Sequence, residues 1–277
     1  MSSVWKPKTS LNTAAFPPGT PIDRMLTDTA EAGFDAVEFV ISSDGPLTFD
    51  LPDTTYIEIA KQARDVGLLI SGLFLREALE INVASLRDEA RETAVEHTVA
   101  ALDRAVQLGT NVVIVIPGVV GPPGSSSPWV SYEEAYLRSL DALLQLRFEA
   151  ERRAIQIVCL VGSNRFLLSP METREFMDRI NSPWVRVCLN TAEILSIGYP
   201  QDWILGLGHR LARVYLNDCR LGSADGHQPC HLGDGDIHWP EIMAALRDIE
   251  YRGLFAYNGG GYDLNDIELR LERILEM

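Results

Sequence analysis

Residues that can exchange protons stand at or directly after two predicted strands of this chain. Glu38 interrupts the apolar residues of the alternating stretch 34–41, which predicts a strand with Glu38 projecting near its top. Asn190 and Glu193 follow the apolar stretch 185–189. Carboxylates act as general bases, and amides orient carbonyl or hydroxyl groups. The pattern predicts acid–base chemistry on a small oxygenated molecule.

A second polar region follows residues 213–217, which have the composition of a buried parallel strand. Residues 218–231 are predicted to form a polar loop, with His209, His227 and His231 nearby. Imidazole is the side chain whose ordinary pKa lies nearest to neutral pH. Histidines in this region therefore add a second kind of proton-exchanging group.

The loop closes on Leu232-Gly-Asp-Gly-Asp-Ile-His-Trp-Pro-Glu241, where Gly233 and Gly235 permit a tight turn. A helix is predicted at residues 241–249 and a final strand at residues 254–257. This is a βαβ unit whose loops leave the C-terminal ends of two strands. Barrels of the α/β class carry their chemistry at those ends.

The remaining elements alternate between strand and helix along the whole chain. Further strands are predicted at residues 8–12, 34–41, 68–74, 111–116, 155–160 and 185–189. Helices are predicted at residues 21–32, 54–66, 85–108, 132–154, 170–180 and 200–207. Eight strands alternating with helices over 277 residues predict one α/β domain, a (β/α)8 TIM barrel spanning residues 1–277.

Four local patterns refine this prediction. Thr20 is expected to cap the first helix, with Pro21 at its first position. The β-branched stretch 111–116 is typical of a strand covered on both faces. The irregular segment 117–128 is predicted to form a lid over the barrel, with Trp129 at its far edge. The apolar face of the longest helix is predicted to consist of Val95, Val99, Leu102 and Val106.

The composition excludes several classes of partner. A net charge of −15 without a basic patch opposes binding to nucleic acid or to anionic membranes. No apolar run approaches the roughly 20 residues that span a bilayer, and residues 1–12 do not resemble a signal peptide. The four cysteines have no CxxC spacing and are expected to be reduced thiols. A cytoplasmic protein is predicted.

Five short motifs carry a family resemblance that extends over nearly the whole chain. They are Ser10-Leu-Asn-Thr13, Ala30-Glu-Ala-Gly-Phe-Asp-Ala-Val-Glu38, Phe166-Leu-Leu-Ser-Pro170, Gly198-Tyr-Pro-Gln-Asp-Trp203, and Leu232-Gly-Asp-Gly-Asp-Ile-His-Trp-Pro-Glu241 with Tyr251-Arg-Gly253. In this order they resemble the xylose isomerase-like TIM barrels. That superfamily contains sugar phosphate isomerases and epimerases and also dehydroshikimate and inosose dehydratases.

The resemblance implies a metal site whose ligands this chain has lost. Family members hold one divalent metal with a glutamate, an aspartate, a histidine and a second glutamate at the ends of strands five to eight. The motifs align these positions with Leu160, Asn190, Tyr215 and Asn258. Leucine offers no donor atom, and amides and a neutral phenol are poor substitutes for carboxylate or imidazole. No metal and no other cofactor is therefore predicted.

Four residues are predicted to be catalytic. By the resemblance, Glu193 lies three residues after the lost aspartate, where epimerases often place a substrate-contacting histidine, and is the candidate base. Tyr215 is predicted to donate or exchange a proton. His231 occupies the position just before the Gly-Asp-Gly turn at which relatives often carry a substrate-binding arginine. Glu38 is a second candidate base. The alternatives are a solvated glutamate, a tyrosine packed in the barrel mouth, an exposed loop histidine, and a glutamate paired structurally with an arginine.

Seven further residues are predicted to line the substrate cavity. They are Asn190, Asn258, Asn217, Asp218, His227, Trp129 and Leu160. The amides among them suit the orientation of a carbonyl or hydroxyl group. None of the lysines follows a glycine, and Gly259-Gly-Gly261 lacks the pattern of a dinucleotide-binding loop.

These observations leave three functions open. The first is a metal-independent isomerase, epimerase, dehydratase (lyase) or cyclase acting on a small carbonyl compound, in specialised biosynthesis. The second is a catalytically inactive barrel that serves as a binding or partner subunit. The third is a metal-dependent sugar isomerase or epimerase with relocated ligands, for example Glu193, His227 and His231. The expected partner is a small-molecule substrate, with a homo-oligomer left open.

Overall fold

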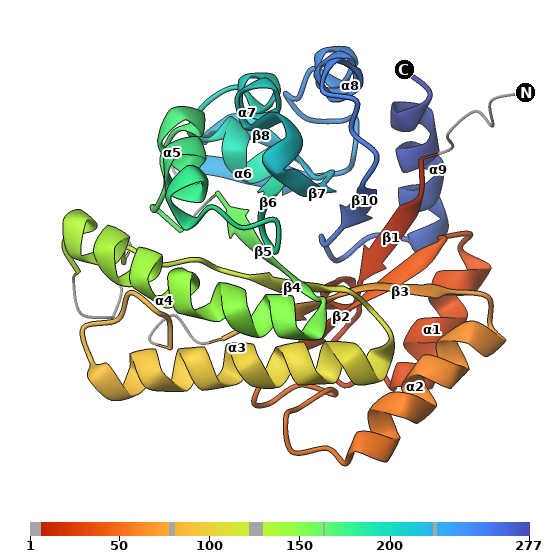
Figure 1. Cartoon of the computed structure of the whole chain (residues 1–277). Helices are drawn as coiled ribbons and strands as arrows, with labels where there is room; N and C mark the ends of the chain where they lie inside the picture. The colour runs from red at the N-terminus through yellow and green to blue at the C-terminus, as the bar shows by residue number, and fades with distance from the viewer. Residues whose placement is uncertain (1–6, 78–80, 122–129, 163, 224–225) are drawn as a thin grey trace, which may run out of the picture.

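A closed barrel of eight parallel strands forms the centre of the molecule in the computed structural model (Figure 1). The structure describes residues 7–77, 81–121, 130–162, 164–223 and 226–277. Around the barrel the strands follow the order β1-β10-β7-β6-β5-β4-β3-β2. They are β1 (Thr9–Asn12), β2 (Ala36–Ile41), β3 (Leu69–Leu75), β4 (Val112–Val115), β5 (Gln156–Val161), β6 (Val185–Asn190), β7 (Leu211–Tyr215) and β10 (Leu254–Tyr257). The predicted TIM barrel is confirmed.

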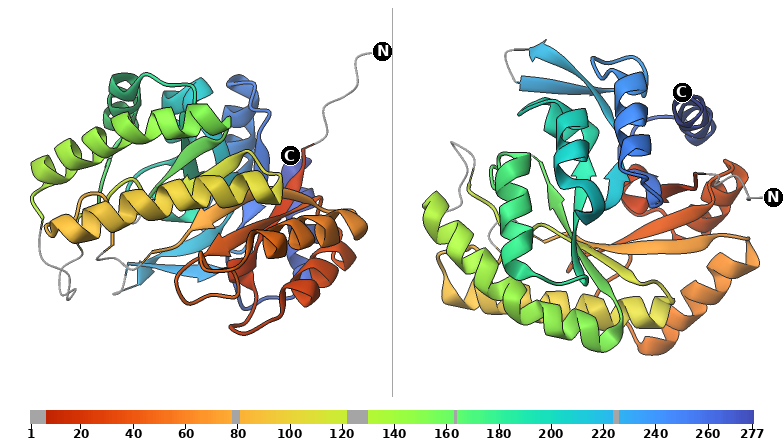
Figure 2. Two further views of the ribbon diagram at one scale, coloured as in Figure 1. Left: turned by 60° about the horizontal axis from the view of Figure 1, so that its bottom comes forward. Right: turned by 45° about the horizontal axis from the view of Figure 1, so that its top comes forward.

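Helices cover the outside of this barrel (Figure 1). They are α1 (Ile22–Glu31), α2 (Asp53–Asp65), α3 (Asp88–Leu108), α4 (Tyr132–Arg153), α5 (Pro170–Ile180), α6 (Thr191–Leu195), α7 (Pro200–Leu207), α8 (Trp239–Asp248) and α9 (Leu264–Leu275). Short 3₁₀ turns occur at η1 (Thr13–Ala15) and η2 (Gly208–Arg210). The long helices α3 and α4 run side by side (Figure 2).

Apolar residues form two layers of core. The larger layer fills the space between the barrel and its helices, while a smaller cluster fills the barrel interior. The interior cluster consists of Val40, Phe74, Ile114, Val158, Leu160, Cys188, Tyr215 and Ala256. None of the helices within the described ranges combines the length and apolarity needed to cross a membrane.

The start of the first helix differs from the prediction by one position. Pro21 is the N-cap, the helix begins at Ile22, and no side chain caps it. The Thr20 hydroxyl instead donates to the Pro17 carbonyl oxygen at 2.7 Å, which closes the preceding turn. The threonine is therefore used by the loop and is not available to the helix.

The predicted polar loop 218–231 is wrong in form, because much of it is a β-hairpin. Strands β8 (Asp218–Ser223) and β9 (Gly226–Cys230) pair antiparallel and lie apart from the barrel strands (Figure 2). Arg220 pairs with Gln228 across the hairpin. A two-stranded ribbon needs no buried apolar face, so its polar sequence carries none of the alternation that signals a strand.

The buried face of α3 also differs from the predicted one. Leu102 is buried as expected, but Val95 and Val99 are only partly buried and Val106 is 52% exposed. The buried face consists mainly of small residues, namely Ala90, Ala94, Thr98, Ala101, Leu102, Ala105 and Leu108. Small side chains allow a helix to pack closely against its neighbours, and this overrides the valine periodicity. Most of the predicted lid, residues 122–128, lies outside the described residues.

Candidate active site

Asn190 organises the polar groups at the C-terminal mouth of the barrel. It ends β6, and its side-chain oxygen accepts the backbone N–H groups of Ala192 at 3.1 Å and Glu193 at 3.4 Å, which caps α6. Its amide nitrogen donates to Glu193 Oε1 and to Asn258 Oδ1, both at 3.4 Å. We call Asn190, Glu193 and Asn258 the mouth cluster. It joins the ends of β6 and β10.

Glu193 is half-buried and leans over the end of β5. A Cβ atom added at Gly162, directly after β5, would overlap the Glu193 carboxylate. The glycine therefore permits the carboxylate to lie across the mouth. The sequence analysis did not single out Gly162, since nothing local distinguishes it from a turn glycine.

Leu160 and Tyr215 lie beneath the mouth cluster, in the apolar cluster inside the barrel. Leu160 is 7% exposed and Tyr215 has no exposed surface. In the sheet register Asn190 pairs with Tyr215, and Tyr215 pairs with Ala256 of β10. The four positions aligned with the family's metal ligands thus meet at one end of one barrel.

A buried polar network extends from Tyr215 into the barrel. Glu38 is completely buried, and its Oε1 accepts a hydrogen bond from Asn12 Nδ2 at 2.7 Å and another from the Tyr215 hydroxyl. Its Oε2 lies 3.7 Å from Arg213 Nη2, which also donates to the Ser71 carbonyl oxygen at 2.5 Å. The alternative in which Glu38 pairs with an arginine is the one that the geometry shows.

Burial, reinforced by the neighbouring Glu38 carboxylate, raises the pKa of Tyr215 well above its ordinary value. The phenol therefore stays protonated near neutral pH and acts as a hydrogen-bond donor. Because neither Tyr215 nor Glu38 has accessible surface, a substrate at the mouth does not touch them in this structure. We treat both as positioning residues.

The same effect predicts that the protein loses stability at alkaline pH. Burial raises the pKa of Cys159 from 9.0 to about 12, and it also raises the pKa values of Cys188, Tyr215 and Tyr251. A group whose pKa is higher in the folded state favours folding fully below its unfolded pKa and loses that contribution above it. We expect urea-unfolding midpoints to be constant up to about pH 8 and to fall steadily from about pH 9 to 11. A flat profile over that range would contradict the burial of these groups.

Asp218, predicted to bind substrate, is instead engaged by the loop that follows it. One carboxylate oxygen accepts the Cys219 N–H at 2.9 Å. The other accepts the N–H groups of Gly233 at 2.9 Å, Gly235 at 3.1 Å and Trp239 Nε1 at 3.2 Å. The predicted tight turn at Gly233 and Gly235 forms around this carboxylate. Gly235 allows the close approach, because a Cβ atom at this position would overlap the Asp218 carboxylate. Asp218 holds this turn in place, and we leave it out of the proposed catalytic machinery.

Replacing Asp218 by alanine should lower the free energy of unfolding by about 2–3 kcal/mol, since four donors lose a charged acceptor in a buried site. Urea denaturation measures this loss. The matched control is Asp65→Asn, an exposed aspartate on α2, which should change stability by less than about 0.5 kcal/mol. Equal effects of the two changes would contradict the structural role of Asp218.

The other predicted site residues have different positions. Asn217 is half-buried beside Thr191, and its side-chain oxygen is buried without a hydrogen-bond partner among the described residues. His231 packs against Tyr262, with ring centroids 3.6 Å apart, and its Nδ1 lies 3.3 Å from Asp266 of α9. The histidine thus faces α9.

His209, His227 and Trp129 were also expected near the mouth of the barrel. His209 lies in η2 before β7, at the N-terminal end of the barrel, and not near the polar loop as the sequence suggested. The side chain of His227 and the whole of Trp129 lie outside the described residues.

The donors at the mouth do not fit a divalent metal. Leu160 supplies no donor, Asn190 and Asn258 supply neutral amides already bonded to each other, and the raised pKa of Tyr215 opposes phenolate formation. Within the ranges that the structure describes, no group of three or more His, Cys, Asp or Glu residues could hold a metal ion. We derive no catalytic step through a metal.

Arg213 and Asn12 belong to the buried network and were not among the residues predicted from the sequence. A usable signal existed for Arg213, because it lies two residues before Tyr215 and side chains two apart on a strand share one face. An inward Tyr215 therefore implied an inward Arg213. No comparable signal placed Asn12 beside Glu38.

The closed barrel with polar groups at its C-terminal mouth defines the chain as a TIM-barrel protein. A family model described as xylose isomerase-like TIM barrel matches residues 26–263, and the chain belongs to that family. It is 24% identical over 237 residues to an uncharacterized protein of Methanocaldococcus jannaschii, covering 82% of this chain and 75% of the relative.

Solved structures of similar fold include several sugar epimerases. An L-ribulose 3-epimerase superposes with a TM-score of 0.79 at 16% identity, covering 98% of this chain and 95% of the other. A D-psicose 3-epimerase, determined in the presence of D-fructose, gives 0.77 at 20% identity, with coverage of 95% and 89%. A 3-keto-D-glucoside 4-epimerase of E. coli gives 0.77 at 15% identity, with coverage of 98% and 100%. At these identities the likeness establishes the fold.

Proposed function

We propose that this protein is an isomerase-type enzyme that moves a proton on a small, oxygenated carbonyl compound without using a metal. The single observation that carries the proposal is the mouth cluster, in which one half-buried carboxylate lies beside two side-chain amides. A carboxylate next to amides can remove a proton from carbon while the amides bind the adjacent carbonyl or hydroxyl oxygens.

In this mechanism Glu193 is the base. It takes a proton from the carbon next to the substrate carbonyl and returns it to a neighbouring atom on the same face. The side-chain amide of Asn258, which lies beside Glu193 in the mouth cluster, orients the oxygens of the substrate. Since the mouth cluster contains one carboxylate, it suits a one-base shift, as in isomerisation or enolisation, better than a two-base epimerisation.

The buried network supports the site from below. Tyr215 and Arg213 fix Glu38 inside the barrel, and Leu160 with Tyr215 forms the floor of the mouth. Neutral amides stabilise an enolate less than a cation does, so the substrate should form a stabilised carbanion, as a β-dicarbonyl compound does. Such substrates suit specialised biosynthesis. The sugar epimerases with the same fold favour polyhydroxylated ketones as the first class to test.

A second candidate function has its own support. Leu160 and Tyr215 fill the barrel interior where family members hold their metal, as expected of a barrel that binds a ligand or partner without catalysis. The two candidates differ in whether carbon-bound hydrogen exchanges with solvent.

The experiment is to incubate the protein in D₂O with ketohexoses, ketopentoses, 3-keto glycosides and β-dicarbonyl acids, and to follow proton spectra by NMR. The proposal predicts deuterium at the carbon beside the carbonyl of one class, at a rate far above that of the buffer. Saturable binding without exchange in any class would overturn it in favour of the binding barrel.

A further inference from the structure

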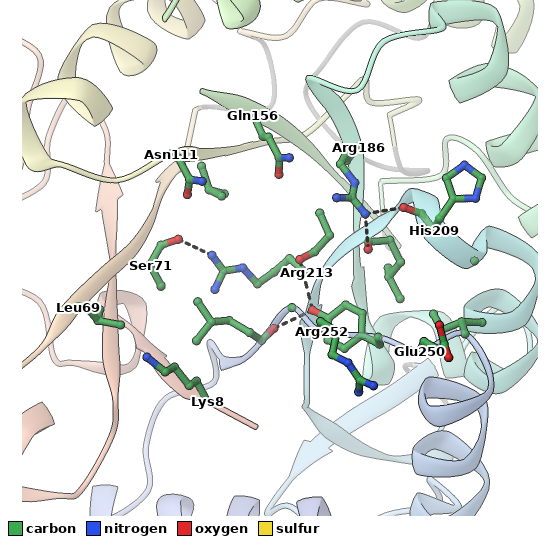
Figure 3. A pocket seen from close by; sticks show the side chains of 18 residues that line it. Lys8, Leu69, Ser71, Asn111, Gln156, Arg186, His209, Arg213, Glu250 and Arg252 are labelled. Atoms are coloured by element: carbon green, nitrogen blue, oxygen red, sulfur yellow. Dashed lines mark hydrogen bonds between the residues drawn. The ribbon is translucent and has the colours of Figure 1, made fainter. Parts of the chain in front are cut away.

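A cavity of about 730 Å³ opens at the N-terminal end of the barrel, opposite the mouth cluster. It is lined by residues at the starts of the barrel strands, among them Ser71 of β3, Gln156 of β5 and Arg213 of β7 (Figure 3). Its volume lies within the roughly 300–1,000 Å³ of small-molecule sites. Residues at this end of a TIM barrel usually contribute to stability, and the active site lies at the other end. A cavity of this size at the N-terminal end therefore requires a separate explanation.

Positive charge gathers around this cavity. Lys8, Arg186, Arg213 and Arg252 line it, with Glu250 as the acidic residue among the lining side chains. Glu38, which is paired with Arg213 behind the lining, offsets one of these positive charges and leaves an excess of cations. The whole chain carries a net charge of −15. A concave site with an excess of cations concentrates positive potential, which attracts a small anion despite the overall charge.

Arg213 lines the cavity and has one donor without a hydrogen-bond partner among the described residues. Its side chain is 3% exposed, and its Nη2 serves the Ser71 carbonyl oxygen and the Glu38 carboxylate. Its Nη1 is buried and has no hydrogen-bond partner among the described residues. In Figure 3 the guanidinium lies in the middle of the lining side chains, directed toward Ser71. Leaving a charged donor buried and unpaired is costly, so the site lacks an acceptor.

The surroundings of Arg213 hold the site in shape. Arg186 donates to the carbonyl oxygens of His209 and Leu211, the latter at 3.0 Å, and burial lowers its pKa. The amide side chains of Asn111 and Gln156 border the same cavity. Arg186 supplies a partly buried positive charge, and the two amides lie near the unpaired Nη1 of Arg213. Together these groups can bind an oxyanion through charge and hydrogen bonds.

We propose that this cavity binds a small metabolite through its carboxylate or phosphate group, with Arg213 Nη1 as the central donor and Lys8 and Arg186 supplying charge. The site lies at the opposite end of the barrel from the mouth cluster, although Arg213 also belongs to the buried network beneath that cluster. Its test therefore measures binding and not turnover.

The test is isothermal titration calorimetry of the full chain with inorganic phosphate and, separately, with succinate. The ionic strength is held constant with sodium chloride. We expect saturable binding of at least one probe. The double variant Arg213→Gln with Glu38→Gln removes the donor without stranding a buried charge, and it should weaken binding at least about ten-fold. The control Arg24→Gln removes a positive charge at an exposed ion pair elsewhere and should leave binding unchanged.

A second variant guards against an effect of the double substitution on folding. Lys8→Gln changes an exposed residue before β1, should leave the fold intact, and should weaken binding of the same probe. Binding of phosphate alone or of succinate alone assigns the anionic group of the ligand. No saturable binding of either probe, or equal affinity of the wild type and the double variant, would overturn the proposal.

Discussion

Replacement of Glu193 by glutamine should reduce solvent deuterium incorporation into the substrate by roughly 100- to 10,000-fold, the usual contribution of a positioned general base. Glutamine keeps the size of the side chain and can still contact Asn190, so the geometry of the mouth cluster survives while the basic oxygen is lost. The measurement is the NMR exchange rate at saturating substrate.

The matched control for this variant is Glu58→Gln, which neutralises a 54% exposed glutamate on α2. It should leave the exchange rate unchanged. Circular dichroism and urea midpoints should be the same for both variants, because Glu193 is only half-buried. An unaltered exchange rate in Glu193→Gln would remove this residue from the mechanism.

The second large effect concerns the stability of the buried pair between Glu38 and Arg213. Either Glu38→Gln or Arg213→Gln alone should lower the free energy of unfolding by roughly 3–5 kcal/mol, because each leaves an uncompensated charge inside the barrel. The double variant should lose clearly less than the sum of the two single losses, because it buries no net charge. Urea denaturation of all four proteins measures the coupling.

The exposed pair of Arg24 and Asp28, with nitrogen and oxygen 2.7 Å apart, is the natural comparison. Its arginine is 68% exposed, so Arg24→Gln should change stability far less than either change at the buried pair. Strictly additive losses for Glu38 and Arg213 would show that the two charges do not interact inside the barrel.

The barrel could be predicted from the sequence because its signals are local and repeated. The β-branched run that became β4 and the Ser169-Pro170 start of α5 both occur where the pattern placed them. The hairpin of β8 and β9 could not be found in this way, since only Asp218 and Cys219 of its described residues are buried and the paired residues beyond them are exposed. The face of α3 was misplaced because alanine, which sets the packing distance, carries a weaker hydrophobic signal than valine.

The candidate site was predictable in part. The sequence placed Asn190 and Asn258 at the ends of two strands, and in the structure their side chains meet, because the C-terminal ends of parallel strands lie at one mouth. The sequence did not show that Glu38 and Tyr215 would bond to each other and be closed off from solvent, because this depends on contacts between β2 and β7 across the barrel. Nor did it show that Asp218 would serve the turn at Gly233, which is a contact 15 residues along the chain.

Proton transfer at this mouth is proposed to need no cation, and this can be tested by metal analysis and chelation. Protein purified without chelator is analysed for bound metals by mass spectrometry, and its exchange rate is compared before and after dialysis against EDTA. We predict no stoichiometric divalent ion, a rate unchanged by EDTA, and no gain on adding Mn²⁺, Mg²⁺ or Co²⁺. A stoichiometric ion whose removal abolishes exchange, and whose return restores it, would show that the proton transfer depends on a metal.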